Sequence, residues 1–156
     1  MTARYVPAEH GGVGGDWYDV FILPSGWLCV VMGDVVGRGL GAAAMMGRLR
    51  SALRAHALHG SDPAEVLNRL DQQAQQFNYD VMATEQLAMF EPSFGRMHLS
   101  SAGHSPPVLA IPDQPAALVE VPSDHPVGVR SGCAQWAAAA GDDGRRAAGC
   151  AALFLH

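Results

Sequence analysis

The apolar positions along the chain divide it into strand-like and helix-like stretches. Short apolar runs over residues 18–23 and 27–32 are separated by a Pro-Ser-Gly turn, which predicts an antiparallel hairpin. Residues 42–58 then carry apolar side chains at the spacing of one helix face. The residues of this expected face are Met45, Met46, Leu49, Ala52, Leu53 and Ala57. We therefore expect a strand hairpin followed by a helix whose apolar face packs into the core.

A second helix is expected from Asp62 to about Phe77. Asp62 is a natural N-cap, Pro63 suits the first helical position, and Glu65 completes a pattern like that of a capping box. Its expected apolar face consists of Val66, Leu67, Leu70, Ala74 and Phe77. The glutamines between these positions are expected to face water, namely Gln72, Gln73, Gln75 and Gln76.

From residue 82 the apolar spacing becomes that of extended chain. The expected strands cover residues 82–91, 96–101, 108–111, 118–121, 133–140 and 151–155. Turns are expected at 92–95 and 141–144, and a loop is expected at 124–129. Helices and strands together indicate an α/β or α+β fold, and the length favours a single domain over residues 1–156.

Composition narrows the class of protein. Hydrophobic residues make up 49% of the 156, so a substantial core can form, and a net charge of −5 gives no basic surface for nucleic acid. The three cysteines, Cys29, Cys133 and Cys150, are an odd number without paired spacing, which favours reduced thiols. The sequence contains no signal-peptide pattern and no membrane-spanning apolar run. We therefore expect a cytoplasmic protein without nucleic-acid or membrane partners.

Two aspartates in glycine-rich surroundings are the main candidates for chemistry. Asp34 follows the apolar run 27–32 and opens a glycine-rich turn, and Asp16 follows Gly14 and Gly15 before the first strand. In an antiparallel hairpin these two positions lie at the same edge. Ionised carboxylates there need a counter-charge, a metal ion or backbone donors, and Mg²⁺ and Mn²⁺ prefer oxygen ligands. The residue types alone leave a metal site and a pair of solvated or turn-capping aspartates equally open.

The same turn also fits a dinucleotide-binding fingerprint. Residues 37–42 read Gly-Arg-Gly-Leu-Gly-Ala between a strand and a helix. That motif requires a second parallel strand that ends in an acidic residue, whereas here the first helix leads directly into a second helix. Asp34 would also place a negative charge beside the pyrophosphate. The dinucleotide interpretation is therefore disfavoured.

Five segments resemble one known family. They are residues 14–21, residues 33–39 with the following Ala-Ala-Ala-Met, Ala83-Thr84, residues 102–107 and residues 126–129. In order and spacing they are similar to the metal-dependent PPM serine/threonine phosphatases, specifically to the bacterial branch that includes SpoIIE and RsbU. The resemblance extends from about Tyr5 to Leu155, which is nearly the whole chain.

The resemblance implies a four-layer α-β-β-α sandwich in which two antiparallel sheets are flanked by helices. It implies a site for two Mn²⁺ or Mg²⁺ ions, with Asp34 bridging both, the Val35 carbonyl binding one, and Asp16 adding to the site. The implied reaction is hydrolysis of phosphoserine or phosphothreonine by a water activated between the two metals. The implied substrate is a regulatory protein of the anti-sigma-factor antagonist type.

Arg38 departs from the family pattern, because many members have histidine at this position. Its guanidinium could pair with a substrate phosphate, or Arg38 could be an ordinary exposed loop residue. His104 belongs to a family motif, and its position before two prolines favours a structural role.

A larger departure concerns the end of the chain. Family members carry further metal aspartates, one in a Thr-Asp-Gly segment that follows a strand like residues 151–155. We therefore expect the domain to be incomplete at its C-terminal end and weakly active or inactive as it stands. Asp142 and Asp143 are not accepted as substitutes. The alternative function is a non-catalytic, metal-poor interaction module with the phosphatase fold, and an exposed final strand would permit a homodimer.

Overall fold

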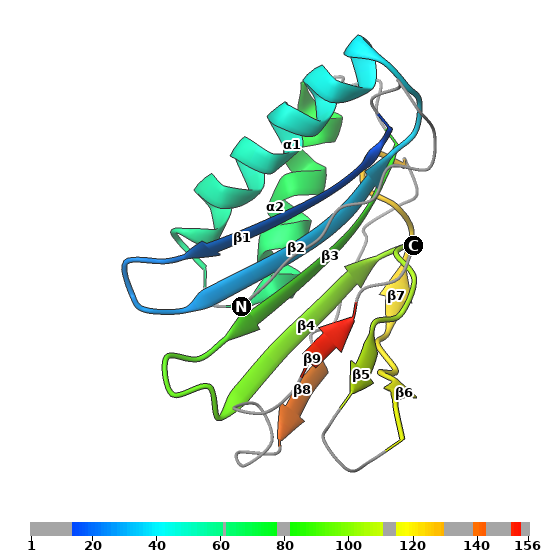
Figure 1. The fold of residues 1–156 in the computed structure, drawn as a ribbon. Coiled ribbons are helices and arrows are strands. Elements are labelled where there is room, and N and C mark those ends of the chain that lie inside the picture. The colour runs from blue at the N-terminus through cyan, green and yellow to red at the C-terminus, as the bar shows by residue number, and fades with distance from the viewer. Residues whose placement is uncertain are drawn as a thin grey trace.

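The computed structural model describes residues 14–60, 62–77, 82–110, 115–129, 139–142 and 151–153. Two sheets and two helices form an α+β fold (Figure 1). The elements are β1 Asp16–Ile22, β2 Leu28–Val35, α1 Leu40–Ala57, α2 Pro63–Gln76, β3 Ala83–Phe90, β4 Arg96–Ala102, β5 Val108–Ala110, β6 Ala117–Leu118, β7 Ser123–Asp124, β8 Ala139–Asp142 and β9 Ala151–Leu153.

The larger sheet has six strands in the order β1-β2-β3-β4-β7, with β8 also pairing with β4. All of its pairings are antiparallel except that of β4 with β7. The smaller sheet has the order β6-β5-β9, and it lies toward the β4 side of the molecule in Figure 1. Both helices lie on one side of the larger sheet, where α1 contacts β2 and α2 contacts β3 and β4 (Figure 1). The expected α+β fold with two sheets is confirmed.

The hairpin of β1 and β2 is longer than the sequence predicted. Its turn is closed by hydrogen bonds from the Leu23 amide to the Trp27 carbonyl and from the Gly26 amide to the Leu23 carbonyl, each 2.8 Å long. Gly26 has a φ of +86°, which a glycine adopts without strain. The pairing continues through both candidate carboxylates, so Asp16 and Asp34 lie inside the strands, and the expectation that they flank them was wrong.

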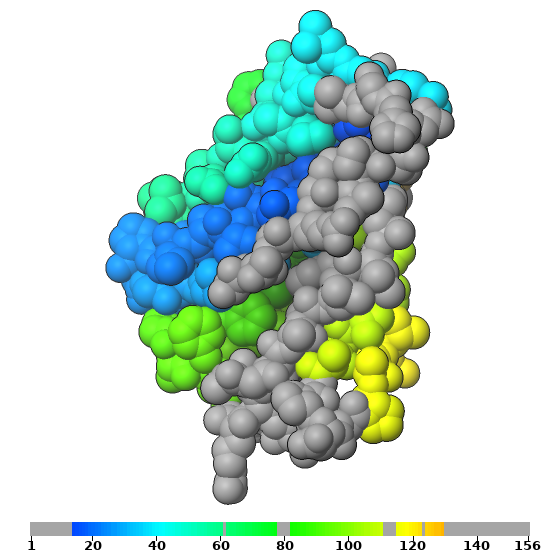
Figure 2. Space-filling view, in the orientation of Figure 1, coloured from blue at the N-terminus to red at the C-terminus, as the bar shows by residue number. Residues whose placement is uncertain are grey.

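Helix α1 begins two residues earlier than expected, and its apolar face is confirmed. Leu49, Leu53 and Ala57 are buried, and Met45, Met46 and Ala52 pack against the same core. Its outer face is open to solvent in Figure 2. This packing attaches α1 to the sheet beside the Asp34 turn.

Helix α2 begins as predicted, since the Asp62 carboxylate accepts a hydrogen bond from the Ala64 amide at 2.9 Å and Pro63 occupies the first turn. Other expectations about this helix were wrong. Glu65 pairs with Arg69 instead of closing a capping box, and Phe77 is 61% exposed because the helix ends before it.

Two of the four glutamines of α2 also differ from the expectation. Gln75 donates a hydrogen bond to Asp71, and Gln73 is hydrogen-bonded to His56 of α1 at 2.8 Å. These side chains therefore hold neighbouring groups in place instead of only facing water.

The predicted strands around the turn 92–95 are confirmed as β3 and β4. The later strands differ more: β6 is shorter than predicted and begins one residue earlier, and β7 ends on Asp124, the first residue of the expected loop. Residues 139–142 form β8: residues 139 and 140 lie in the expected strand, whereas 141 and 142 were expected in a turn and instead continue the pairing with β4. The predicted strand residues 111, 133–138 and 154–155 lie outside the described residues, as do Asp143, Cys133 and Cys150.

The main core lies between the larger sheet and the two helices. It includes Val31 and Leu87 from the sheet and Leu53 and Leu67 from the helices. Cys29 is a buried free thiol, and burial raises its pKa to about 11. None of the described helices is both long and apolar enough to cross a membrane.

Candidate functional site

The two candidate carboxylates are direct neighbours across the hairpin. Asp16 of β1 pairs with Asp34 of β2, and Asp34 pairs in turn with Thr84 of β3. Directly opposed residues in antiparallel strands point to the same face, with Cβ atoms about 5 Å apart. All three residues are partly accessible to solvent. The fold therefore places two carboxylates and a hydroxyl in one row across three strands, on the face opposite the helices.

Gly15 brings the backbone of β1 unusually close to this row. A Cβ atom at residue 15 would lie 2.0 Å from the Val35 carbonyl oxygen and 2.4 Å from Asp34 Oδ1. The Val35 amide also donates a 3.0 Å hydrogen bond to the Gly15 carbonyl. Only glycine leaves room at this position, and the close approach places the Val35 carbonyl near the Asp34 carboxylate.

This set of oxygen atoms can be tested against a divalent cation. No group of three or more His, Cys, Asp or Glu side chains is spaced to hold a metal within the described ranges. Mg²⁺, however, is commonly bound by one or two carboxylates, with waters and substrate phosphates completing its shell. Two neighbouring carboxylates beside a backbone carbonyl fit that chemistry, so the donor set is suited to Mg²⁺ or Mn²⁺.

Arg38 lies in the exposed loop that follows the carboxylate row. Gly37 and Gly39 on either side of it have φ values of +120° and +77°, a region that favours glycine. Arg38 makes no hydrogen bond or ion pair with another residue of the described part of the chain. Its charge is therefore available to an anion that approaches this loop.

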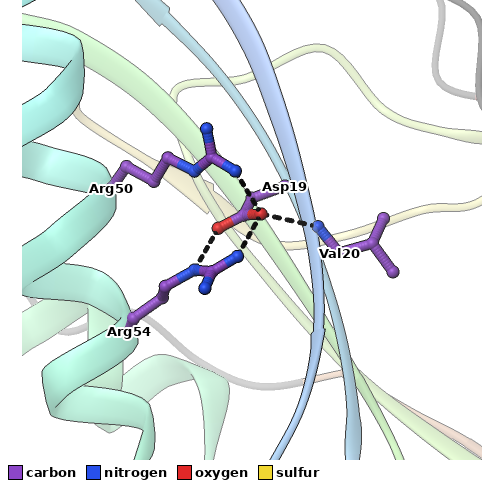
Figure 3. Close-up of polar contacts among 4 residues, drawn as sticks. All are labelled: Asp19, Val20, Arg50 and Arg54. Carbon is purple, nitrogen blue, oxygen red and sulfur yellow. Dashed lines mark hydrogen bonds and ion pairs between the residues drawn. The ribbon is translucent and has the colours of Figure 1, made fainter.

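Asp19 forms the strongest charge cluster in the described structure. It lies three residues after Asp16 on β1 and therefore faces the opposite side, toward α1. Arg54 Nε donates to Asp19 Oδ2 at 2.6 Å, and the Nη2 atoms of Arg54 and Arg50 donate to Oδ1 at 2.7 and 2.9 Å (Figure 3). The Val20 amide donates a further hydrogen bond to Oδ1. This cluster ties the start of β1 to α1.

The charge state of Asp19 follows from these contacts. The side chain is only 3% exposed, and its burial would raise the pKa, but the hydrogen bonds from Arg54 and Arg50 lower the pKa to about 2. Arg54 also stacks over the Phe21 ring, with 4.9 Å from its guanidinium carbon to the ring centroid. Asp19 is thus a fully ionised structural anchor and lies on the wrong face to join Asp16 and Asp34.

Replacing Asp19 with asparagine should lower the free energy of unfolding at pH 7 by about 1–2 kcal/mol, because the arginines lose their ionic partner. The lowered pKa means that the stabilisation is present above about pH 4 and is lost as pH falls toward 2. Urea unfolding of wild type and Asp19→Asn at pH 7 and pH 3 measures this. Asp62→Asn is the control, since asparagine also caps helices. A gap as large at pH 3 as at pH 7 would contradict the ionic role.

A second buried acid lies behind the carboxylate row. Glu85 of β3 is fully buried among core residues, and Gly33 separates it from Trp17. A Cβ atom at residue 33 would lie 2.9 Å from Glu85 Oε2 and 2.5 Å from Trp17 Nε1, so glycine makes room for both. Among the described residues neither carboxyl oxygen of Glu85 has a hydrogen-bond partner. Burial raises the pKa of Glu85 well above its ordinary value.

The segments around His104 and residues 126–129 meet at the start of β3. Thr84 Oγ1 and His104 Nδ1 are hydrogen-bonded at 2.9 Å. Ala83 and Val127 exchange two backbone hydrogen bonds, and the Gly128 amide donates to the buried Asp71 carboxylate of α2 at 2.8 Å. Of the motifs that carried the family resemblance, residues 102–107 therefore contact Thr84, and residues 126–129 pair with the neighbouring Ala83.

Sequence reasoning missed Asp19, Glu85 and the contact of Thr84 with His104. Strand periodicity contained a signal for the two acids, because residues two apart in a strand face the same side. Asp19 therefore shares the buried side of β1 with Trp17, and Glu85 shares the buried side of β3 with Leu87. An acid at a buried strand position requires either a partner or a proton. The Thr84 contact had no local signal, since Thr84 lies on β3 and His104 lies beyond the end of β4.

Comparison with known proteins agrees with this geometry. A model of the family Stage II sporulation protein E (SpoIIE) matches residues 24–141. The structure of the RsbU and RsbW domains of a Mycobacterium tuberculosis protein is 33% identical, with a TM-score of 0.73, and covers 86% of this chain and 37% of that chain.

Two more distant structures share the fold. The PP2C phosphatase domain of SpoIIE from Bacillus subtilis is 16% identical, with a TM-score of 0.68, covering 85% of this chain and 39% of that one. RsbX in complex with magnesium is 15% identical, with a TM-score of 0.66, covering 86% of this chain and 63% of that one. The chain thus spans between about a third and two thirds of these structures' lengths. Because the family match extends over most of the sequence and these structures share its fold, the chain belongs to the SpoIIE family and has the fold of PP2C-type phosphatases.

Proposed function

We propose that this chain is the catalytic part of a metal-dependent protein phosphatase that hydrolyses phosphoserine or phosphothreonine on a regulatory protein. The observation that carries the proposal is the direct pairing of Asp16 with Asp34 beside the Val35 carbonyl, within a SpoIIE-family fold. Two adjacent carboxylates repel one another, and that repulsion is relieved by a cation between them.

Asp16, Asp34 and the Val35 carbonyl would hold Mn²⁺ or Mg²⁺ in a site for two ions. When bound, the metal supplies an activated water and positive charge for the phosphoryl oxygens. The magnesium complex of RsbX supports a divalent cation in this fold. Asp16 and Asp34 are thus the residues on which we expect the chemistry to depend.

Arg38 is the residue of this chain that would bind the phosphate group of the substrate. Its planar guanidinium can donate two parallel hydrogen bonds to a phosphate group. The flanking glycines, Gly37 and Gly39, place no side chain directly beside Arg38. Arg38 would therefore orient the phosphoryl group toward the carboxylate row.

The proposed substrate is a phosphorylated regulatory protein of the anti-sigma-factor antagonist type, and the proposed location is the cytoplasm. Support comes from the similar structure that carries RsbU and RsbW domains, and from a stressosome structure with a TM-score of 0.69. The chain's acidic charge also argues against a nucleic-acid partner.

A second candidate is a non-catalytic interaction module. The small number of carboxylates at the site favours it, because the described ranges hold no group of three metal-binding side chains. Such a module would keep the fold and the docking of a regulatory protein without hydrolysis.

The test is a calorimetric titration of the purified chain with Mn²⁺ and with Mg²⁺, followed by an assay on a phosphoserine peptide with the metal present and with EDTA. The proposal expects saturable metal binding, and any hydrolysis should disappear on chelation. If neither metal produces heat above dilution, the interaction module is the better description. Hydrolysis that persists in EDTA would overturn the metal mechanism itself.

A further inference from the structure

Thr84 is the third residue of the row that contains Asp16 and Asp34, and its hydroxyl is hydrogen-bonded to His104. Thr84 lies directly across the strand pair from Asp34, and its hydroxyl oxygen is hydrogen-bonded to His104 Nδ1 at 2.9 Å. Thr84 and Asp34 share one face of the sheet. A hydroxyl at this position is therefore the polar side chain of β3 nearest to the proposed metal ligand.

His104 is fixed by the turn that presents it. His104 is 6% exposed, and the Ser101 hydroxyl donates a 3.1 Å hydrogen bond to the His104 carbonyl oxygen. The preceding Gly103 has a φ of +68°, and a Cβ atom there would lie 2.9 Å from Pro126 Cγ. Residue 103 must therefore be glycine, which sets the direction in which the His104 ring leaves the backbone.

The tautomer of His104 decides what Thr84 can offer to Asp34. A hydroxyl has one proton to donate, and a carboxylate can only accept. If His104 Nδ1 carries no proton, Thr84 donates to it and has no proton left. If Nδ1 carries the proton, the ring donates to Thr84 Oγ1, and the hydroxyl proton is available to the Asp34 carboxylate, directly or through one water.

We propose that Thr84 and His104 form a positioning pair in which the Nδ1–H tautomer of His104 turns the Thr84 hydroxyl proton toward Asp34. A hydrogen bond from Thr84 selects one orientation of the carboxylate and leaves its remaining lone pairs for the cation. Groups that orient metal ligands in this way typically contribute 10- to 100-fold to metal affinity. This inference rests on the proposed metal-binding function.

The test compares Mn²⁺ dissociation constants measured by calorimetry. Thr84→Val keeps the shape of the side chain and removes the hydroxyl, and the expected loss of affinity is about 10-fold or more. Thr84→Ser should restore affinity to within about threefold of wild type. Ser93→Ala, which removes a hydroxyl from an exposed turn, is the control and should have no effect. The double variant Thr84→Val with His104→Gln should bind no more weakly than Thr84→Val alone.

Nitrogen-15 NMR of labelled histidines at pH 8 tests the tautomer without metal. Assigned through the His104→Gln spectrum, His104 should carry its proton on Nδ1, and an Nε2–H tautomer would overturn the pair. Unchanged Mn²⁺ affinity in Thr84→Val, with a wild type that binds Mn²⁺, would also overturn it. Absence of Mn²⁺ binding by wild type would overturn the proposed function, and the metal role of the pair with it.

Discussion

Replacing Asp34 with asparagine is expected to weaken Mn²⁺ binding by about 100-fold or more and to reduce any metal-dependent hydrolysis in proportion. The substitution keeps the size of the side chain but removes the charge, and Asp34 is central in the row between Asp16 and Thr84. Hard divalent cations bind charged oxygen ligands far more strongly than amide oxygens, so loss of the central carboxylate exceeds the effect of an orienting group. Calorimetry with Mn²⁺ measures the loss directly.

Two further variants show whether the effect belongs to the site. Asp62→Asn removes the same charge at a helix N-cap and should leave Mn²⁺ affinity unchanged. Asp16→Asn should weaken binding as well, because it pairs with Asp34. If Asp34→Asn bound Mn²⁺ as tightly as wild type, any metal bound by this chain would lie elsewhere.

Replacing Glu85 with methionine is expected to stabilise the fold by about 2–4 kcal/mol at pH 8, since it removes a buried acid and keeps an apolar volume of similar size. Neither carboxyl oxygen of Glu85 is hydrogen-bonded within the described part of the chain. Because burial raises the pKa of Glu85, the unfolded chain releases this proton at a lower pH than the folded chain does. That ionisation favours the unfolded state more strongly as the pH rises.

The dependence on pH has a definite sign. Below the unfolded pKa of about 4.5, Glu85 is protonated in both states and ionisation does not affect stability. Above it, wild type should lose roughly 1.4 kcal/mol per pH unit relative to Glu85→Gln, until the pH reaches the folded pKa. Urea unfolding of both proteins from pH 5 to pH 8 measures the difference. If the unfolding free energies of wild type and Glu85→Gln changed in parallel from pH 5 to pH 8, Glu85 would be ionised in the folded state and the prediction would be wrong.

The first half of the fold was predictable because its signals are local. The apolar runs around the Pro-Ser-Gly turn, the apolar face from Met45 to Ala57, and the Asp62 cap each depend on residues a few positions apart. The strands β6, β7 and β8 are two to four residues long, and their pairing depends on the partner strand. Pairing with β4 therefore keeps residues 141 and 142 extended, although their local sequence predicted a turn.

The candidate site also contains features that the local sequence predicted and features that depend on residues far apart in the chain. The neighbouring positions of Asp16 and Asp34 follow from the symmetry of a hairpin, and that expectation was confirmed even though the strand limits were not. The partners of Asp19 lie 31 and 35 residues away on α1, so no local pattern pointed to them. Thr84 and His104 are 20 residues apart in the sequence, so no local pattern indicated their hydrogen bond.

The turn between β1 and β2 has a consequence for how this domain can vary in length. The seven residues of β1 separate the turn from Asp16 by roughly 20 Å. A single residue inserted or deleted at the turn would shift β1 by one position against β2. Trp17 or Gly15 would then stand opposite Asp34, and Asp19 would face away from α1. We therefore expect this distant surface turn to accept changes of residue type but not of residue number.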